Sequence, residues 1–212
     1  MSTTNKYNEI LNLFTVQCEF RTWMNKPFIA GEKAIASNSF ALAAVNLEKT
    51  EKIGPLDGQI IENILSVIPA KQGPIKDFSI KSLTDILSAQ PLVDEFEECE
   101  ECDGDGLVEW SYLNYDKHFD CPKCGGTGSI KTGKKVIDNS KRLRIGNSAF
   151  SLNIINLIVK AAVILNLETI YLVHQTEAYT GSIFQVGDVE ILCMPVQEDN
   201  DQHIVGEVSL SE

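Results

Sequence analysis

The sequence lacks the long apolar runs of a membrane protein and the excess of basic residues typical of a nucleic-acid coat. No apolar run in its 212 residues reaches the roughly eighteen that a bilayer-spanning helix needs. The most apolar stretch, Ile154–Leu167, is interrupted by Asn156, Lys160 and Asn166. Eighteen Lys and Arg residues stand against thirty Asp and Glu residues, and the net charge of −12 argues against a surface that wraps nucleic acid throughout.

Catalytic signatures are also scarce. The three histidines, His118, His174 and His203, show no motif spacing to a nucleophile, and the carboxylates lie in runs that are typical of a solvated surface. The segment 126–132 contains glycines and a lysine, but Ile130 stands where a phosphate-binding P-loop requires glycine directly before the lysine. The sequence therefore predicts a protein that is not an enzyme.

The N-terminal residues Met1–Asn8 are polar and lack the apolar segment of a signal peptide. We therefore expect a cytoplasmic protein without membrane contact, in a reducing compartment where cysteines stay available for metal. Cys18 and Cys193 lie among apolar neighbours and are predicted to be core residues.

The other four cysteines stand in two matched C-x-x-C-x-G-x-G units, Cys99–Gly106 and Cys121–Gly128. Each C-x-x-C turn can bring two thiolates to one ion, and the eighteen residues between the pairs fall inside the zinc-site range. Four thiolates close the coordination sphere, so the sequence predicts one structural zinc ion. The predicted ligands are Cys99, Cys102, Cys121 and Cys124. A redox pair, two disulfides or four separate core cysteines are the alternatives, and His118 is an alternative ligand or a hairpin surface residue.

Acidic residues gather before and within the first cysteine unit, and basic residues gather after the second. Eight acids precede and enter the first unit: Asp94, Glu95, Glu97, Glu98, Glu100, Glu101, Asp103 and Asp105. Six bases follow the second: Lys131, Lys134, Lys135, Lys141, Arg142 and Arg144. An acidic and a basic strand that pair in solvent explain this pattern, with little net energy from each pair. A contact of the basic arm with phosphate or an acidic partner is the alternative.

Hydrophobic periodicity and turn residues predict an α+β protein. Helices are predicted over Tyr7–Cys18, Gln59–Val67, Ile80–Ala89 and Phe150–Asn166. Strands are predicted over Pro27–Ala30, Lys33–Val45, Gly106–Tyr112, Ser129–Ile137, Thr169–His174, Ser182–Val186 and Val189–Met194. Ile204–Leu210 is a further edge-strand candidate, and the polar segment Glu198–Asp201 is expected to fray.

The repeated C-x-x-C-x-G-x-G unit resembles the cysteine-rich region of DnaJ-type co-chaperones. That family carries four such repeats and two zinc ions, whereas this chain has two repeats, enough for one ion. No His-Pro dipeptide is present, so the helical J-domain signature is absent. The resemblance implies a zinc site, and it leaves open an alternative function as a module that binds unfolded polypeptides.

The segments on either side of the cysteine units resemble one domain of a bacterial DNA polymerase sliding clamp. The segment 36–43 is similar to the family pattern A-T-D-G-H-R-L-A at Ala36, Leu42 and Ala43, with Ser37 and Asn38 near-isosteric. The segment 191–196 resembles a clamp's closing strand, which ends in Met-Pro. The resemblance implies a peptide-docking role for Ser37, Asn38, Met194 and Pro195.

The expected architecture is a single sliding-clamp-like domain over residues 1–93 and 145–212, with a zinc-binding β-hairpin inserted over residues 94–144. A clamp ring requires two or three such domains per chain, and clamps line the ring with basic helices, which this chain does not offer. The combination of a clamp-like domain with an inserted zinc hairpin resembles proteins encoded by phages and other mobile elements. We expect a non-catalytic zinc protein that presents surfaces to protein partners, in a replication assembly. DNA binding and self-association into a homo-oligomer are left open.

Overall fold

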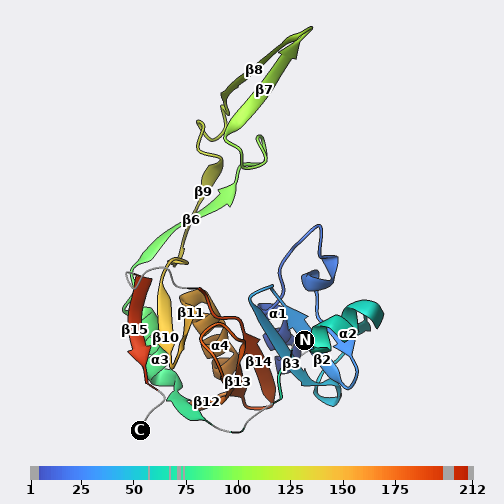
Figure 1. Cartoon of the computed structure of the whole chain (residues 1–212), viewed down its shortest axis with the longest axis vertical. Helices are drawn as coiled ribbons and strands as arrows, with labels where there is room; N and C mark the ends of the chain where they lie inside the picture. The colour runs from blue at the N-terminus through green and yellow to red at the C-terminus, as the bar shows by residue number, and fades with distance from the viewer. Residues whose placement is uncertain are drawn as a thin grey trace. The chain divides into compact units, whose positions relative to one another are not determined.

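The computed structural model describes residues 5–56, 58–66, 68–70, 73, 75–197 and 203–209. The chain forms two compact units (Figure 1). The larger unit comprises Met1–Ala89 and Asn139–Glu212, and the smaller unit comprises Gln90–Asp138. The expected α+β class is confirmed, and each unit is described by itself.

The larger unit is built on an eight-stranded sheet with the order β4-β1-β2-β3-β14-β13-β12-β5. Its strands are β1 (Phe28–Ala30), β2 (Lys33–Ser37), β3 (Ala41–Asn46), β4 (Gly54–Pro55), β5 (Lys76–Ser79), β12 (Thr169–His174), β13 (Ser182–Val186) and β14 (Val189–Cys193). Neighbours are antiparallel except for the β1–β4 pair. The β3–β14 pair joins the N-terminal strands to the C-terminal strands, so two distant parts of the sequence share one sheet.

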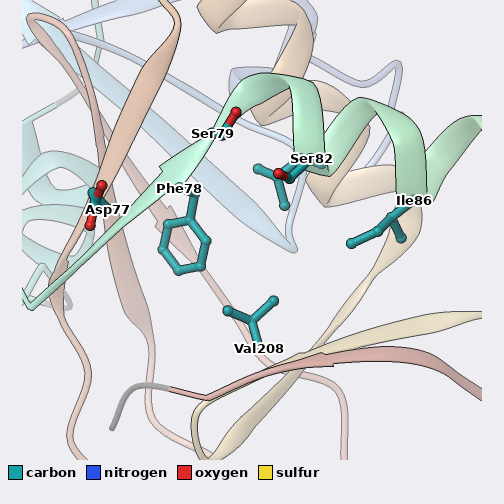
Figure 2. Close-up of a pocket in the computed structure, with 7 residues that line it drawn as sticks. Asp77, Phe78, Ser79, Ser82, Ile86 and Val208 are labelled. Atoms are coloured by element: carbon teal, nitrogen blue, oxygen red, sulfur yellow. The ribbon is translucent and has the colours of Figure 1, made fainter. Parts of the chain in front are cut away.

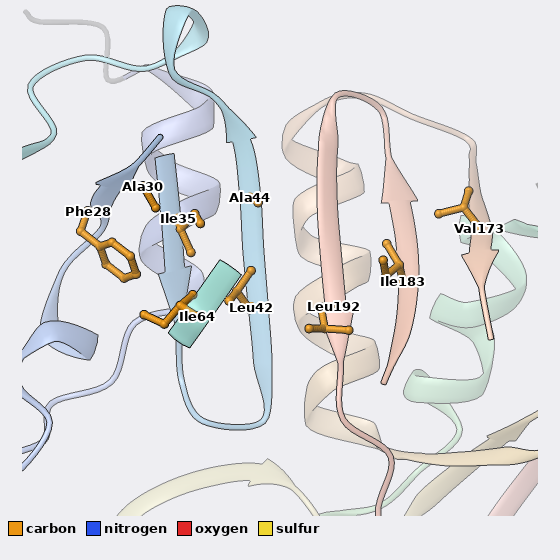
Figure 3. Packing of buried hydrophobic residues seen from close by; sticks show 9 residues of the cluster. All are labelled: Phe28, Ala30, Ile35, Leu42, Ala44, Ile64, Val173, Ile183 and Leu192. Carbon is orange, nitrogen blue, oxygen red and sulfur yellow. The ribbon is translucent and has the colours of Figure 1, made fainter. Parts of the chain in front are cut away.

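Most strands of the large sheet are largely buried on both faces, and helices pack against them. Helix α1 (Lys6–Leu13) contacts β2 and β3, α4 (Leu152–Ile164) contacts β13 and α1, and α3 (Ile80–Ser88) contacts α4. On the face drawn in Figure 3, Ile64 of α2 (Gly58–Ser66) joins a buried cluster that includes Leu42 and Leu192. Helix α4 starts where the Ser151 hydroxyl accepts a hydrogen bond from the Asn153 N–H, which satisfies a free donor of the first turn.

A second sheet of the larger unit has the order β11-β10-β15. Its strands are β10 (Arg142–Ile145), β11 (Ser148–Ser151) and β15 (Ile204–Val208), with β15 parallel to β10. The predicted strand at the C-terminal end is therefore confirmed over Ile204–Val208. The segment Glu198–Asp201, expected to fray, lies outside the described residues.

Two predicted elements of the N-terminal part are wrong in extent. The strand predicted over Lys33–Val45 is two strands, because the Asn38 side chain accepts hydrogen bonds from the N–H groups of Phe40 and Ala41 and closes a turn. Ser39 at that turn has φ of 75°. The helix predicted to reach Cys18 ends at Leu13, and the chain beyond it leaves to bond with the residues around Met24.

The remaining helix and strand predictions agree with the structure to within two residues at most ends. The helix predicted from Phe150 begins at Leu152, because the preceding residues belong to β11. Short 3-10 turns at Thr22–Asn25 and Leu47–Lys49, and the strands β4, β5, β10 and β11, had no sequence prediction. These strands hold two to four residues each, too few for a period-of-two pattern to stand out.

The smaller unit consists of two antiparallel strand pairs with the cysteine loops between them (Figure 1). Strand β6 (Leu92–Glu98) pairs with β9 (Ser129–Ile137), and β7 (Leu107–Tyr112) pairs with β8 (Tyr115–Asp120). The predicted pairing of an acidic with a basic arm is confirmed. In the part of the chain that the structure describes, no helix is long and apolar enough to cross a membrane.

Candidate metal centre

The four cysteines of the repeated motif meet at one point in the smaller unit. Cys99 and Cys102 lie in the loop after β6, and Cys121 and Cys124 lie in the loop after β8. Their Sγ atoms all lie within 4.8 Å of one another. Cys99, Cys102 and Cys121 are buried, and Cys124 is half-buried.

The sulfur distances fit a shared ion better than a covalent bond. Cys99 Sγ lies 3.8 Å from Cys121 Sγ, and Cys102 Sγ lies 3.8 Å from Cys124 Sγ. A disulfide requires about 2.05 Å, and all four thiols are free. Zinc–sulfur bonds of about 2.3 Å in a tetrahedron place the sulfurs about 3.8 Å apart. The group can therefore hold a metal ion.

The two loops hold each other by matching hydrogen bonds. The N–H of Cys99 donates to the carbonyl oxygen of Gly128 at 2.9 Å, and the N–H of Cys121 donates to that of Gly106 at 2.8 Å. The same two glycines donate to sulfur: Gly106 N–H to Cys102 Sγ at 3.2 Å, and Gly128 N–H to Cys124 Sγ at 3.3 Å. The repeated sequence thus folds into two equivalent half-sites.

The last glycine of each motif has no room for a side chain. Both have positive φ, 76° at Gly106 and 73° at Gly128. A Cβ at Gly106 would lie 2.4 Å from the carbonyl oxygen of Gly126, and one at Gly128 would lie 2.1 Å from that of Gly104. Only glycine permits this backbone conformation and this close approach, which explains why glycine occupies the final position of each motif.

The thiols differ in acidity because their surroundings differ. Burial raises the pKa of Cys102 to about 12, against the hydrogen bond from Gly106. Burial also opposes ionisation of Cys124, but backbone N–H groups and the neighbouring thiols outweigh it and lower the pKa of Cys124 to about 6. Because a bound metal displaces the remaining thiol protons, its affinity falls as the pH falls.

The surroundings of the cluster are small and apolar. Val108 and Ile130, both partly buried, pack against the cysteines. His118, considered as an alternative ligand, is exposed on β8 and does not belong to the cysteine group. Of the two other cysteines, Cys193 is buried in the larger unit, where burial raises its pKa, and Cys18 is half-buried.

The six bases proposed as a phosphate contact are divided between the units. Lys131, Lys134 and Lys135 lie on β9, whereas Lys141, Arg142 and Arg144 lie at or on β10. Lys131 and Lys135 bind the Asp94 carboxylate at 2.8 and 2.6 Å. Arg142 donates to the carbonyl oxygens of Asn139 and Lys141. Several of these cations therefore already have partners within the chain.

The residues proposed for peptide docking come together at the edge of the large sheet where the central strands β2 and β14 end and β3 begins. The N–H of Met194, which follows β14, donates to the carbonyl oxygen of Phe40 at 2.8 Å. Ser37 is buried, and its hydroxyl donates to the carbonyl oxygen of Ala41 at 3.0 Å, while Asn38 holds the turn. Met194 and Phe40 are exposed, and Pro195 is half-buried.

Two groups of exposed apolar side chains had no sequence prediction, one at this edge and one in the smaller unit. Phe40, which is 65% exposed, had no predicted role. The rings of β7 and β8 were not identified as a surface, although Trp110 and Tyr112 stand two residues apart and strand residues two apart share a face. That period-of-two spacing was the available signal.

A pocket of about 170 Å³ in the larger unit lies between β5, α3 and β15 (Figure 2). Its lining is apolar apart from Asp77 and the hydroxyls of Ser79 and Ser82. Catalysis at such a site requires several convergent polar groups.

No protein-family profile matches the chain, and no curated protein matches it. Among solved structures, it is similar to a DNA polymerase sliding clamp from Pseudomonas aeruginosa, with a TM-score of 0.50, 11% identity, and coverage of 93% of this chain and 66% of that chain. The DNA polymerase III β subunit of Thermotoga maritima gives a TM-score of 0.45 and 13% identity over 91% and 63% of the two chains. The DNA polymerase III β chain of Streptococcus pneumoniae gives a TM-score of 0.46 and 14% identity, over 91% of this chain and 63% of that chain.

The chain thus spans less than two thirds of the length of these clamps. At such low identity, the similarity to the Pseudomonas aeruginosa clamp shows the fold alone. The predicted clamp-like α+β fold is confirmed.

Proposed function

We propose that this chain is a non-catalytic accessory protein, in which a clamp-like unit presents a docking surface and one structural zinc ion fixes an inserted hairpin. In this proposal the clamp-like part spans residues 1–93 and 145–212 and the insertion spans residues 94–144, which differ by a few residues from the larger and smaller units at 1–89, 139–212 and 90–138. The observation that carries the zinc half of the proposal is the meeting of four free thiols at tetrahedral spacing. The six free cysteines agree with a reducing, cytoplasmic location.

Zinc, held by Cys99, Cys102, Cys121 and Cys124, takes a structural role in this proposal. Four protein ligands leave no open coordination position for water or substrate. Structural zinc sites contribute about 10–16 kcal/mol of folding free energy in small peptides. A contribution of this size suits a unit whose buried apolar side chains are mainly the cysteines themselves.

Substituting a ligand tests the zinc site. Cys99→Ser is expected to lose the metal and unfold the loops 99–106 and 121–128, because three thiolates no longer complete the site. Elemental analysis measures the stoichiometry, and hydrogen exchange follows each unit separately. Cys18→Ser, a cysteine outside the cluster, is the matched control and should keep one zinc per chain. A Cys99→Ser protein with full zinc content would contradict the ligand assignment.

A protein partner is proposed to dock at the edge formed by Phe40, Met194 and Pro195. Exposed apolar side chains that gather at one place mark interaction surfaces. Ser37 and Asn38 support this edge by holding the turn that carries Phe40. The fold is similar to that of a DNA polymerase sliding clamp, so the proposed partner is a component of a DNA polymerase.

Removing the exposed side chains of this edge tests the docking surface. Phe40→Ala with Met194→Ala is expected to weaken binding of a purified replicative DNA polymerase by about tenfold or more. Tyr171→Ala with Tyr179→Ala removes exposed aromatic rings elsewhere in the same unit and is the control. Equal affinity of the docking-edge variant and the wild type would remove this role.

A protein partner is favoured over DNA by the charge distribution. Phosphate contacts supply most of the affinity for duplex DNA, yet Lys131 and Lys135 are paired with Asp94. The chain as a whole carries a net charge of −12. Reversing Lys134, Lys135, Arg142 and Arg144 to Glu would abolish a salt-sensitive affinity for duplex DNA if DNA, rather than a protein, were the ligand.

A DnaJ-like module that binds unfolded polypeptides is the alternative. The observation in its favour is the pair of equivalent half-sites formed by the two C-x-x-C-x-G-x-G motifs. Suppression of aggregation of a chemically unfolded protein, lost in Cys99→Ser, would support this alternative over clamp-like docking.

A further inference from the structure

The hairpin β7–β8 has one aromatic face and one polar face. The register pairs Val108 with Phe119, Trp110 with Lys117, and Tyr112 with Tyr115. Because paired residues and residues two apart share a face, these six side chains lie together, and we call them the aromatic face. The opposite face carries Leu107, Glu109, Ser111, Asp116, His118 and Asp120.

The rings of the aromatic face are exposed to solvent. The exposed fractions are 53% for Trp110, 60% for Tyr112, 72% for Tyr115 and 48% for Phe119. Trp110 and Tyr112 stack with centroids 5.8 Å apart, and the Lys117 ammonium lies 5.3 Å from the centre of the Phe119 ring. Large rings bury much apolar area when they are covered, so a contiguous exposed group of this kind indicates a binding surface.

The aromatic face is anchored to the cysteine cluster. Val108, at its base, packs against the cysteines, and the N–H of Cys121 donates to the carbonyl oxygen of Gly106, which closes the base of the hairpin. An isolated two-stranded hairpin is marginally stable in water. The cysteine loops therefore hold the base of the hairpin in place.

The charge around the hairpin is strongly negative. Between Cys99 and Gly128 there are seven acids and two lysines, a net charge of −5. The acids are Glu100, Glu101, Asp103, Asp105, Glu109, Asp116 and Asp120. The lysines of β9, two of which bind Asp94, lie beyond this segment. A cationic ligand would therefore complement the net negative charge of residues 99–128.

We propose that the aromatic face binds a cationic, extended polypeptide segment of a partner protein. Guanidinium and ammonium groups stack on Trp and Tyr rings. The acids of the first cysteine loop and of the opposite face of the hairpin attract the same groups through their net negative charge. Apolar side chains of the segment cover the rest of the rings. This surface is separate from the edge at Phe40 and Met194, and it needs from the proposed function only that the cysteine loops fix the hairpin.

Two other occupants fit the observations less well. Single-stranded nucleic acid also stacks on exposed rings, but its backbone requires a positively charged groove, and this end of the unit carries net negative charge. A second copy of the chain would bring another net charge of −12 to an acidic surface. Opposite charge is what a polypeptide rich in Arg and Lys supplies.

Binding of short labelled peptides by the whole, metal-loaded chain tests the proposal. The probes are a peptide of alternating Arg and Leu, its counterpart with Glu in place of Arg, and an oligothymidylate of similar length. Fluorescence anisotropy is expected to show binding of the Arg peptide alone. Trp110→Ser with Tyr115→Ser should weaken this binding by about tenfold or more, because it removes two of the main anchors.

Phe20→Ser with Tyr179→Ser removes two exposed aromatic rings of the larger unit and is the matched control. It should change the affinity by less than about twofold, as most surface substitutions do. Metal content shows that each variant keeps the cysteine site. Tyr112→Ser with Tyr115→Ser is the second variant, should the first lose metal, and it retains Trp110.

Three results would overturn the proposal. The aromatic-face variants could bind the Arg peptide as tightly as the wild type does, which would make the attraction a property of net charge alone. The Glu peptide could bind as tightly as the Arg peptide, which would remove the requirement for a cation. Tighter binding of the oligothymidylate than of the Arg peptide would assign the face to nucleic acid.

Discussion

The two units of this chain are stabilised in different ways. The larger unit buries both faces of its sheet, and Phe14, Phe150 and Phe184 are among its fully buried side chains. In the described part of the smaller unit, the buried apolar side chains are three cysteines, with Val108 and Ile130 packed beside them. A cluster of this size cannot offset the entropy of ordering the chain. The larger unit is therefore stabilised by its core, whereas the smaller unit is expected to depend on the proposed zinc ion.

The same difference decides which side chains are available for binding. Apolar residues on the large sheet are covered by helices, so few of them reach solvent. In the hairpin β7–β8, every residue of β8 and nearly every residue of β7 is exposed. If the proposed zinc ion takes the place of a core, the hairpin can present its rings to solvent and still keep its structure.

The largest expected effect is a loss of stability when the core of the larger unit is disrupted. Phe150 is fully buried and packs edge-on against Phe184 with ring centroids 5.6 Å apart. Phe150→Ala should lower the free energy of unfolding of this unit by about 3–5 kcal/mol, because it leaves a cavity. Chemical denaturation measures the loss, with exposed Phe20→Ala as the control, expected within about 0.5 kcal/mol of the wild type.

Both of these variants should keep the full metal content, because neither residue belongs to the smaller unit. Loss of metal in Phe150→Ala at temperatures where the larger unit is folded would show that the two units do not derive their stability separately.

A smaller effect is expected from the glycine that closes the second cysteine loop. Gly128→Ala places a Cβ 2.1 Å from the carbonyl oxygen of Gly104, at a φ of 73°. The backbone conformation alone costs about 1–3 kcal/mol for a residue with a side chain, and the clash adds to it. Metal affinity, measured by competition with a chelator, should fall accordingly.

Gly125→Ala is the matched control for this substitution. Its φ of 64° is also positive, but a Cβ there meets nothing within 4 Å. It should therefore show the cost of the backbone conformation without the clash. Equal losses of affinity at the two positions would mean that the close approach of the two loops does not stabilise the site.

The smallest effect is expected at the ion pairs between β6 and β9. Hydrogen bonds from Lys131 and Lys135 lower the pKa of Asp94 from its ordinary 3.8 to about 2. A lowered pKa means that the ionised form is stabilised in the folded state. This contribution is fully present above pH 3.8 and is lost as the pH falls through about 2.

Asp94→Asn should therefore lower the melting temperature only slightly, since the carboxylate is partly exposed and screened by solvent. The difference from the wild type should stay constant between about pH 5 and pH 8, because this window lies above both pKa values. Added salt should reduce it. A large or pH-dependent difference within this window would indicate that the strand pair depends on the ion pairs.

Much of the fold could be predicted where a signal extends over several turns or a full strand. The helices α2, α3 and α4 and the strands β12, β13 and β14 follow their hydrophobic periodicity closely. The turn at Asn38–Phe40 was missed, although Ser37, Asn38 and Ser39 form a polar, turn-forming break between two apolar segments. The side-chain hydrogen bonds of Asn38 decide that turn.

The candidate metal site could be predicted because its chemistry is local in each half. The glycine offsets recur because each loop needs the same backbone conformation and the same N–H···S hydrogen bond. Strand β8 was missed because its residues are mostly charged or polar, and its pairing with β7 depends on the cysteine loops beneath it.

By itself, the sequence determined the two cysteine motifs, the long amphipathic elements and the charge of each arm, since these properties belong to neighbouring residues. Tertiary structure alone decided that Phe40 meets Met194, that the six bases fall into two units, and that four rings line one side of a hairpin. The physical reason is register. Strand pairing over long sequence distances sets which side chains share a surface, and it depends on the packing of the whole unit.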